Sequence, residues 1–326
     1  MTDQIASAGA VRIGTSGWSY PSGRGTWNGI FYPVRGERGF RAGDELRYYA
    51  EHFDTVEVNA TFYRPPVAAV TARWLRETPR EFEFSVKLHQ KFSHVTPIGR
   101  GPSSPPATAA RQELPHPTPE DVDEFKAGIE PLADGGKLGV LLLQFPPSFR
   151  RTPEASEYLR GLLRAFREYP VAVELRHRSW SDAEADTLAL LDEFDAAWVQ
   201  IDEPKFRFSI RQTLMPNISR FYYMRLHGRN AEQWWKPDAP EDRYNYLYSP
   251  EELRPIAEVV ALVRPEVRKA YLYLNNHFAA KAVVNAVTLK HQLGMQVEGE
   301  FQDRFVRAYP DVAELVRVPG DDFLFR

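Results

Sequence analysis

The sequence of 326 residues contains no cysteine. Disulfide bonds, thiolate nucleophiles and cysteine-ligated metal sites are therefore excluded, as is usual in a reducing compartment. No apolar run approaches the roughly 18 residues that a membrane-spanning helix needs. Residues 1–10 also lack the basic start and apolar stretch of a secretion signal. We therefore expect a cytoplasmic protein that does not associate with a membrane.

The sequence also lacks a strong charge imbalance and a glycine-rich nucleotide motif. Its 41 Lys and Arg residues nearly balance 44 Asp and Glu residues, which gives a formal net charge of −3. Any attraction to nucleic acid or to another anion must therefore be local. No GxGxxG follows the first apolar run, and this argues against a doubly wound sheet that binds a dinucleotide.

Short apolar runs alternate with segments of helical period along most of the chain. Strands are predicted at 11–16, 54–62, 82–89, 139–145, the start of 171–180, 196–202, 221–227 and 270–275. Helices are predicted at 44–53, 67–77, 121–132, 153–169, 181–194, 250–263 and 279–293. Residues 203–220 show no clear helical period. About eight strand–helix units over this length are typical of a (β/α)8 TIM barrel.

The predicted barrel is a single α/β domain with appended segments. The barrel spans residues 11–293, after an N-terminal tail at 1–10. Proline, serine and small residues at 97–119 predict a mobile insertion after the third strand, with no core of its own. Residues 294–326 are expected to form a C-terminal extension that packs on the outside of the barrel.

Polar residues occupy one face of nearly every predicted strand. In VAVELRHRSW (171–180), Val171, Val173 and Leu175 alternate with Ala172, Glu174 and Arg176. Since the more apolar face of each barrel strand packs against helices, the polar face should point inward. The other inward residues are expected to be Thr55, Glu57, Asn59, Ser85, Lys87, His89, Gln144, Gln200, Asp202, Tyr223, Arg225, His227, Tyr273, Asn275 and Asn276.

Three of these inward residues are cations at the C-terminal ends of strands, where barrel enzymes carry their active sites. Lys87, Arg176 and Arg225 would form a floor that binds phosphate or carboxylate, because guanidinium groups hold such anions bidentately. A structural ion-pair network is the alternative interpretation for each residue alone. Since apolar replacements of buried charges are often neutral or stabilising, a whole set of them favours a functional site.

Acidic residues at the same ends provide candidate catalytic groups. Glu57 and Glu174 are candidates for general acid and base if their pKa values differ. Together with Asp202 and His227 they are also the candidate ligands of a divalent metal, either Mn, Mg or Zn. The three nearby cations and the absence of an HExxH spacing count against a metal.

Loops rich in aromatic residues follow several of the predicted strands. Most of these rings should pin the loops to the barrel, but some should reach a ligand. Flat rings beside cations suit the bases of single-stranded nucleic acid and also sugar rings. The aromatic residues in these loops are Trp18, Tyr20, Trp27, Phe31, Tyr32, Tyr63, Trp180, Trp234, Trp235, Tyr244, Tyr246 and Tyr248.

Motifs at the strand ends resemble those of the YecE-like family, domain of unknown function 72. The motifs are GTSGWSY, TVEVNATFYRPP, FEFSVKLH, LLLQFPPSF, VAVELRHRSW, YMRLHGR and LNN. The resemblance covers roughly residues 11–293 and implies a TIM barrel, similar in outline to xylose-isomerase-like barrels and to a metal-dependent endonuclease that cuts abasic DNA. Leu274 departs from the family, in which Phe is more usual before the paired Asn. The resemblance implies that the family shares Trp18, Glu57, Asn59, Tyr63, Lys87, Gln144, Glu174, Arg176, His177, Asp202, Arg225, His227, Asn275 and Asn276.

Three functions fit this set of residues. The first is a phosphodiester hydrolase that acts on DNA or RNA, an idea that rests largely on fold analogy. The second is an enzyme that acts on a small phosphorylated or carboxylated sugar by acid–base chemistry. The third is a module that binds nucleic acid or another anion without catalysis. The catalytic candidates are Glu57, Glu174, Asp202 and His227, and the substrate-binding candidates are Trp18, Asn59, Tyr63, Lys87, Gln144, Arg176, Arg225, Asn275 and Asn276.

Overall fold

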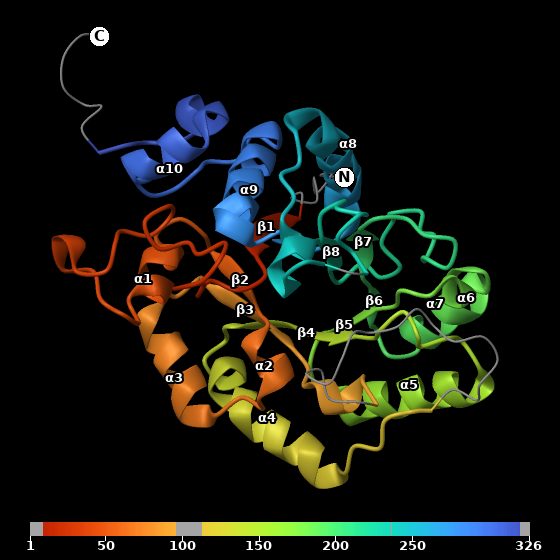
Figure 1. Cartoon of the computed structure of the whole chain (residues 1–326). Helices are drawn as coiled ribbons and strands as arrows, with labels where there is room; N and C mark the ends of the chain where they lie inside the picture. The colour runs from red at the N-terminus through yellow and green to blue at the C-terminus, as the bar shows by residue number, and fades with distance from the viewer. Residues whose placement is uncertain (1–8, 96–112, 236, 320–326) are drawn as a thin grey trace, which may run out of the picture.

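Parallel strands and surrounding helices make up a computed structural model that describes residues 9–95, 113–235 and 237–319 (Figure 1). Of the insertion predicted at 97–119, residues 97–112 lie outside the described residues. The strands are β1 (Ala10–Thr15), β2 (Thr55–Val58), β3 (Glu83–Lys87), β4 (Leu138–Gln144), β5 (Val171–Glu174), β6 (Ala197–Trp198), β7 (Gln200–Asp202), β8 (Tyr222–Leu226) and β9 (Lys269–Leu274).

The strands form two parallel sheets with neighbouring edges. One sheet has the order β1-β9-β8-β7 and the other has the order β2-β3-β4-β5-β6. Val199 alone separates β6 from β7 along the chain, and its N–H donates to the carbonyl of Val173 on β5 over 3.0 Å. Between the other two edges, Ser16 and Glu57 form a parallel bridge. The chain is thus an α/β protein whose two sheets approach each other at both edges.

Helices flank the strands on both sides. Figure 1 shows α3, α4 and α5 below the strands and α8 and α9 above them. The apolar face of β3 packs outward on α3, where the rings of Trp74 and Phe84 lie 5.8 Å apart. The helices are α1 (Glu45–Ala50), α2 (Ala60–Tyr63), α3 (Ala68–Glu77), α4 (Pro119–Asp134), α5 (Pro153–Ala165), α6 (Arg178–Ser181), α7 (Glu184–Asp192), α8 (Pro250–Val263), α9 (Lys281–Gln292) and α10 (Asp303–Ala308).

The polar faces of the strands meet in the interior and satisfy one another. The hydroxyl of Tyr273 lies 2.7 Å from Thr55 Oγ1 and 2.9 Å from Ser85 Oγ. Two residues earlier on the same strand, the hydroxyl of Tyr271 donates to Glu83 over 2.6 Å. These bonds join β9 to β2 and β3 across the interior, so the predicted polar face of these strands does point inward. Buried hydroxyl groups require such partners.

Two predicted elements differ from the observed ones. The predicted strand 54–62 ends at Val58, and the chain turns at once into α2. Thr61 stabilises this turn by donating its hydroxyl to the carbonyls of Lys87 and Val58 over 2.6 and 3.2 Å. The predicted helix 181–194 begins only at Glu184, as α7, because Ala183 has φ −120° and ψ 52° and separates it from the short α6 that ends at Ser181. Residues 203–220 contain no helix, as predicted.

The described part of the C-terminal extension packs on the loop that follows β1. The rings of Phe301 and Phe305 lie 6.0 and 6.1 Å from the ring of Phe31. Arg304 on α10 also pairs with Glu37 over 2.8 Å. Aromatic packing and an ion pair thus hold this segment beside the loop. Among the helices in the described ranges, none is both long and apolar enough to cross a bilayer.

Candidate functional site

Arg225 on β8 is the centre of a buried ion-pair network at the carboxyl ends of the strands. Its Nη2 lies 2.7 Å from Glu57 Oε1 on β2, and its Nη1 lies 2.6 Å from Glu174 Oε2 on β5. Nη1 also donates to Gln144 Oε1 on β4 over 3.0 Å. The exposed fractions are 1% for Arg225 and 0% for both carboxylates. One guanidinium therefore ties together four strands from the two sheets.

Glu57 has hydrogen-bond partners for both of its oxygens. Oε1 accepts from Ser16 over 2.8 Å in addition to Arg225, and Oε2 accepts from the hydroxyl of Tyr223 over 2.7 Å. Burial and the Glu57 charge raise the pKa of Tyr223 well above its ordinary value, so this phenol remains a donor. Strong hydrogen bonds to a buried carboxylate offset part of the cost of removing it from water.

Glu174 is held as an anion by two guanidinium groups. Arg176 Nε donates to Oε1 over 2.6 Å, while Arg225 occupies Oε2. Burial by itself would raise the pKa of Glu174, but Arg176, Arg225 and His227 outweigh that effect and hold it well below its usual range. A carboxylate in this state is a poor general base, because it binds a proton only at low pH.

His227 is a neutral imidazole at the edge of this network. Its Nε2 lies 3.0 Å from Arg176 Nη2, and its Nδ1 lies 2.9 Å from the side-chain amide of Asn275. Burial, together with the nearby Arg176, lowers the pKa of His227 to about 3. The Asn275 atom that faces Nδ1 is the amide nitrogen, which can only donate, and Nε2 also lies 3.4 Å from Glu174 Oε1.

Within the part of the chain that the structure describes, Lys87 is the one member of the predicted cationic floor that has no anionic partner in contact. Its ammonium lies 3.9 Å from the centre of the Phe62 ring, and among the described residues it has no hydrogen-bond partner. Burial lowers the pKa of Lys87 to about 7, and Arg225 adds to this effect; Glu174 and Glu57 oppose it. At neutral pH this side chain is therefore present in both its charged and its neutral form.

Glu203 is a site residue that the strand pattern did not identify. It is 6% exposed, and its Oε2 is buried without a hydrogen bond, 3.6 Å from Arg176 Nη1. Burial raises the pKa of Glu203, and the charge of Glu174 adds to the rise, whereas Arg176 opposes it. The signal available in the sequence was a second acid immediately after Asp202 at the end of a strand.

Asp202 lies outside the network, although it was predicted as a catalytic residue. Arg229 donates to its two oxygens over 2.9 and 2.8 Å, and the hydroxyl of Tyr248 donates over 2.7 Å. Arg229 also pairs with Glu252 at the start of α8. These contacts hold the loop after β8 against the neighbouring helix. Asp202 therefore binds Arg229 and Tyr248, which support the structure, and not the residues of the ion-pair network.

Asn276 and Trp18 also have their contacts elsewhere. The amide nitrogen of Asn276 donates to Asn285 Oδ1 over 2.7 Å and to the carbonyl of Tyr246 over 2.8 Å, which holds the loop before α8. The ring of Trp18 lies 5.3 Å from the ring of Trp74 on α3. Both predicted binding residues therefore contact the supporting structure rather than the ion-pair network.

Asn59 and Tyr63 flank the site from the turn that follows β2. Asn59 Oδ1 is buried and has no hydrogen bond with any described residue, which leaves it available to a ligand donor. Tyr63 on α2 is 58% exposed. The strand-to-helix change at residues 59–63 explains this placement, because a continued strand would have directed these side chains differently.

The donor set does not fit a resident divalent metal. In the parts of the chain that the structure describes, no group of three His, Asp or Glu residues is placed to hold a metal ion. Guanidinium, hydroxyl and phenol groups already occupy the oxygens of Glu57 and Glu174. A metal would have to displace these charge-assisted bonds beside two guanidiniums, which repel it. The predicted set Glu57, Glu174, Asp202 and His227 is therefore not assembled as a metal site.

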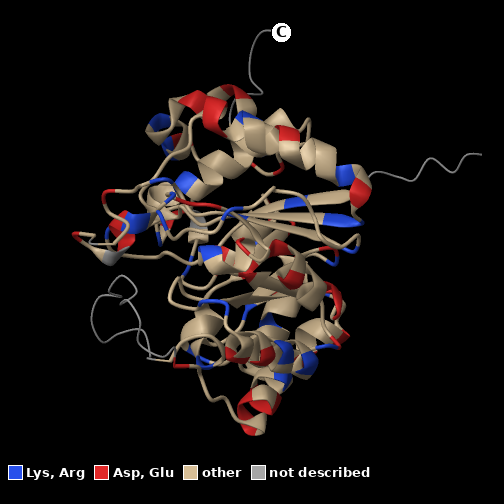
Figure 2. Ribbon diagram, turned by 90° about the vertical axis from the view of Figure 1, so that its right-hand side faces the viewer, with Lys and Arg blue, Asp and Glu red and all other residues tan. Residues whose placement is uncertain are grey.

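Three buried acids and three cations lie at these strand ends, since Glu203 beside Arg176 offsets the charge of Lys87. Glu57 and Glu174 neutralise Arg176 and Arg225. Figure 2 shows that both signs of charge also occur on the helices on either side of the strands. Among the three cations, Lys87 and the Nη1 edge of Arg176 have the weakest contacts with anions within the described residues, because Nη1 has only the 3.6 Å contact to Glu203.

Comparisons with known proteins agree with this architecture. The UPF0759 protein YunF of Bacillus subtilis (strain 168) is 28% identical over 297 residues, which cover 89% of this chain and 96% of YunF. The UPF0759 protein YecE of Escherichia coli (strain K12) is 31% identical over 134 residues, 40% of this chain and 41% of YecE.

Solved structures extend the comparison to the fold. A DUF72 family protein from Thermotoga maritima MSB8 is 32% identical and has a TM-score of 0.71 over 87% of this chain and 99% of that protein. A DUF72 family protein from Enterococcus faecalis V583 has a TM-score of 0.72 at 24% identity and covers 87% and 96% of the two chains. The family model described as "Protein of unknown function DUF72" matches residues 12–308. The resemblance expected from the strand-end motifs is confirmed, and the chain belongs to the DUF72, or YecE-like, family.

Proposed function

We propose that this protein is an enzyme that acts on a small phosphorylated or carboxylated sugar by acid–base chemistry without a resident metal. The observation that carries the proposal is the arrangement of Lys87 and Glu203 around Arg176. Neither Lys87 Nζ nor Glu203 Oε2 has a hydrogen bond within the described residues, and burial moves the pKa of each group toward neutrality. Such groups are poised to exchange protons with a substrate.

The proposal includes a closed (β/α)8 barrel as the scaffold. The near-continuity of β6 and β7 and the bridge between Ser16 and Glu57 support closure of the two sheets into one ring. The polar contacts of Tyr273 with β2 and β3 also cross from one sheet to the other. In a barrel of this kind the carboxyl ends of the strands carry the active site, which is where the ion-pair network lies.

Arg176 is the proposed binding residue for the anionic group of the substrate. Its Nε and Nη2 are engaged by Glu174 and His227, whereas its Nη1 has only the longer contact to Glu203. A guanidinium edge with a free N–H can donate to a phosphate or carboxylate oxygen. An anion bound there would bring the carbon skeleton of the substrate toward Lys87 and Glu203, with the amine in the role of base and the Glu203 carboxyl in the role of acid.

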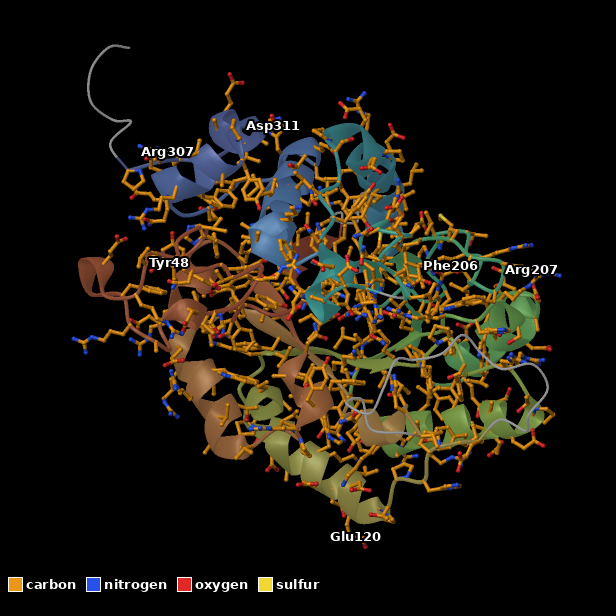
Figure 3. All side chains as sticks on the ribbon, in the orientation of Figure 1. Tyr48, Glu120, Phe206, Arg207, Arg307 and Asp311 are labelled. Carbon is orange, nitrogen blue, oxygen red and sulfur yellow. The ribbon has the colours of Figure 1, made fainter. Side chains whose placement is uncertain are left out.

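Hydrolysis of a phosphodiester in nucleic acid is the second candidate. One observation favours it: the rings of Phe206 and Phe208 each lie 5.4 Å from the ring of Trp235, beside the exposed Lys205 and Arg207. Figure 3 shows Phe206 and Arg207 at the outer edge of the molecule near α6. Aromatic rings beside cations are typical of surfaces that stack unpaired bases.

Proton exchange into deuterated water tests the first candidate without knowledge of the product. The protein would be incubated in deuterium oxide with a panel of sugar phosphates and sugar acids, and carbon-bound deuterium would be measured by NMR. We expect the wild type to label at least one compound and Glu203→Gln to label it at least tenfold more slowly. The matched control is Glu193→Gln, an exposed carboxylate paired with Arg160, which should keep the wild-type rate.

Two outcomes would contradict the first candidate. Absence of both deuterium exchange and saturable binding across the panel would exclude a small anionic substrate of this class. Equal rates in the wild type and Glu203→Gln would remove the proposed role of the buried acid. Cleavage of labelled single-stranded oligonucleotides by the same preparation, lost in Glu203→Gln and retained in Glu193→Gln, would favour the second candidate.

A further inference from the structure

We propose that Lys87 acts as a nucleophile that forms an imine with a carbonyl carbon of the substrate. This inference rests on the proposed function, because it requires a small anionic compound with an aldehyde or ketone group in the same site. It adds a covalent step to that function. Two observations support the proposal: the Lys87 side chain is buried at the end of β3, and its ammonium has no hydrogen-bond acceptor among the described residues.

The surroundings of Lys87 differ from those of the other buried lysines. Lys137 Nζ donates to the carbonyls of Leu75 and Thr78 over 2.9 and 2.8 Å and also to the Thr78 hydroxyl. Lys290 Nζ donates to the carbonyl of His52 over 3.0 Å. Those two ammonium groups have structural acceptors that hold them. Lys87 has the ring of Phe62 on one side and, within the described residues, no acceptor at all.

Four charged side chains act on Lys87, and they come from β2, β5, β8 and the segment that follows β5. Arg225 on β8 and Arg176 after β5 disfavour its protonated form, while Glu174 on β5 and Glu57 on β2 favour it. Both carboxylates, however, already bind guanidinium groups at 2.6 to 2.7 Å. A lysine that is desolvated beside other cations is activated as a nucleophile, because its neutral amine is populated near pH 7.

The proposed step requires one proton donor besides the amine. The lone pair of neutral Lys87 Nζ adds to the carbonyl carbon, and the carbonyl π bond breaks as its oxygen takes a proton. A proton then moves from the newly bonded nitrogen to this hydroxyl, which leaves as water and yields the protonated imine. The carboxyl of Glu203 is the proposed proton donor for the carbonyl oxygen, because burial raises its pKa and its Oε2 has no hydrogen bond among the described residues, only the 3.6 Å contact with Arg176 Nη1. Hydrolysis reverses the step and returns free Lys87.

An amine that only exchanges protons leaves no covalent product, so chemical trapping separates the two roles. The full-length protein would be treated at pH 7 with glycolaldehyde phosphate and sodium cyanoborohydride, which reduces an imine to a stable secondary amine. Peptide mass mapping would then quantify the adduct at each lysine. We expect labelling of Lys87 to exceed that of Lys137 and Lys290 by at least tenfold, and excess inorganic phosphate to suppress it.

Variants make the trapping result specific. Lys87→Met should lose the adduct at its own peptide while labelling elsewhere stays unchanged, and circular dichroism would verify that the variant is folded. Wild-type protein in which Lys87 remains unmodified, while exposed lysines such as Lys205 react, would overturn the imine. The deuterium-exchange experiment remains independent of this result. Exchange without an adduct at Lys87 refutes the covalent step alone, whereas loss of exchange and of saturable binding refutes the proposed function itself.

Discussion

Arg225 Nη1 lies 2.6 Å from Glu174 Oε2, and both side chains are almost completely removed from water. Burial of two ions costs several kcal/mol per ion, which their attraction offsets only when further hydrogen bonds satisfy both groups. Here Arg225 also binds Glu57 and Gln144, and Glu174 also binds Arg176. The network therefore fixes four strand ends in one arrangement and defines the positions of Lys87 and Glu203.

The first prediction concerns removal of the central guanidinium. Arg225→Met should lower the free energy of unfolding by about 3–5 kcal/mol, because it leaves Glu57 and Glu174 buried beside an apolar group. Urea denaturation at pH 7 measures the change. Arg307→Met is the control, since Arg307 is 78% exposed on α10 (Figure 3) and should cost less than about 0.5 kcal/mol. Equal effects of the two variants would contradict the importance of the network.

The second prediction concerns how the free energy of unfolding changes with pH under acidic conditions. The folded-state pKa of His227 is about 3, whereas that of an unfolded histidine is about 6.5. Between these values the unfolded state binds a proton that the folded state does not, so stability falls as the pH decreases. The slope attributable to one such group approaches about 1.4 kcal/mol per pH unit.

His227→Gln should therefore flatten the decline in stability between pH 6 and pH 4, as measured by urea denaturation at several pH values. Gln keeps an acceptor for Arg176 but does not titrate. The control is His291→Gln, which replaces an exposed histidine and should leave the dependence of unfolding free energy on pH as it is in the wild type. A slope that is unchanged in His227→Gln would show that this imidazole takes up its proton in the folded protein as readily as in the unfolded one.

The sequence predicted the strand faces that build the network. Alternation in TVEV and VAVE placed Glu57 and Glu174 opposite their apolar neighbours, and both carboxylates bind Arg225 in the interior. This worked because side chains alternate with a period of two wherever a strand is regular. The family resemblance was available for the same reason, since its motifs lie at the ends of these strands.

The alternation of polar and apolar residues did not predict side-chain directions correctly where the strands end. Alternation assigned Asp202 to the interior, but β7 stops at this residue, and the chain directs Glu203 inward and Asp202 toward Arg229 instead. Trp18 lies in a loop without periodicity, so its packing on Trp74 had no local signal. Contacts of loop residues depend on tertiary packing, which the local sequence does not specify.

The third prediction is that Lys87 reduces stability at neutral pH. Its folded-state pKa is about 7, and an unfolded lysine has a pKa of about 10.4. Between these values the unfolded state holds more protons, so stability rises with pH and is reduced at pH 7. Lys87→Met should raise the free energy of unfolding at pH 7 by about 1 kcal/mol or more, with the gain shrinking toward pH 10.

Lys205→Met tests whether this gain is particular to the buried site. Lys205 is exposed, so its replacement should change the free energy of unfolding by less than about 0.5 kcal/mol at either pH. A gain in stability that coincides with loss of the trapped adduct would be typical of a residue retained for function. Destabilisation by Lys87→Met would instead mean that the ammonium makes a stabilising contact in the folded protein.

The last prediction separates structural support from chemistry at the end of β7. Asp202→Asn should lower the free energy of unfolding by about 1–3 kcal/mol, because it weakens the paired bonds from Arg229 and the bond from Tyr248. Deuterium exchange should stay within about threefold of the wild-type rate, because Asp202 contacts neither Lys87 nor Arg176. Asp182→Asn is the control: its carboxylate pairs with Arg178 on the surface and should contribute about 0.5 kcal/mol or less. Loss of exchange in Asp202→Asn with unchanged stability would restore Asp202 to the active site, since only a group that acts on the substrate would then account for the defect.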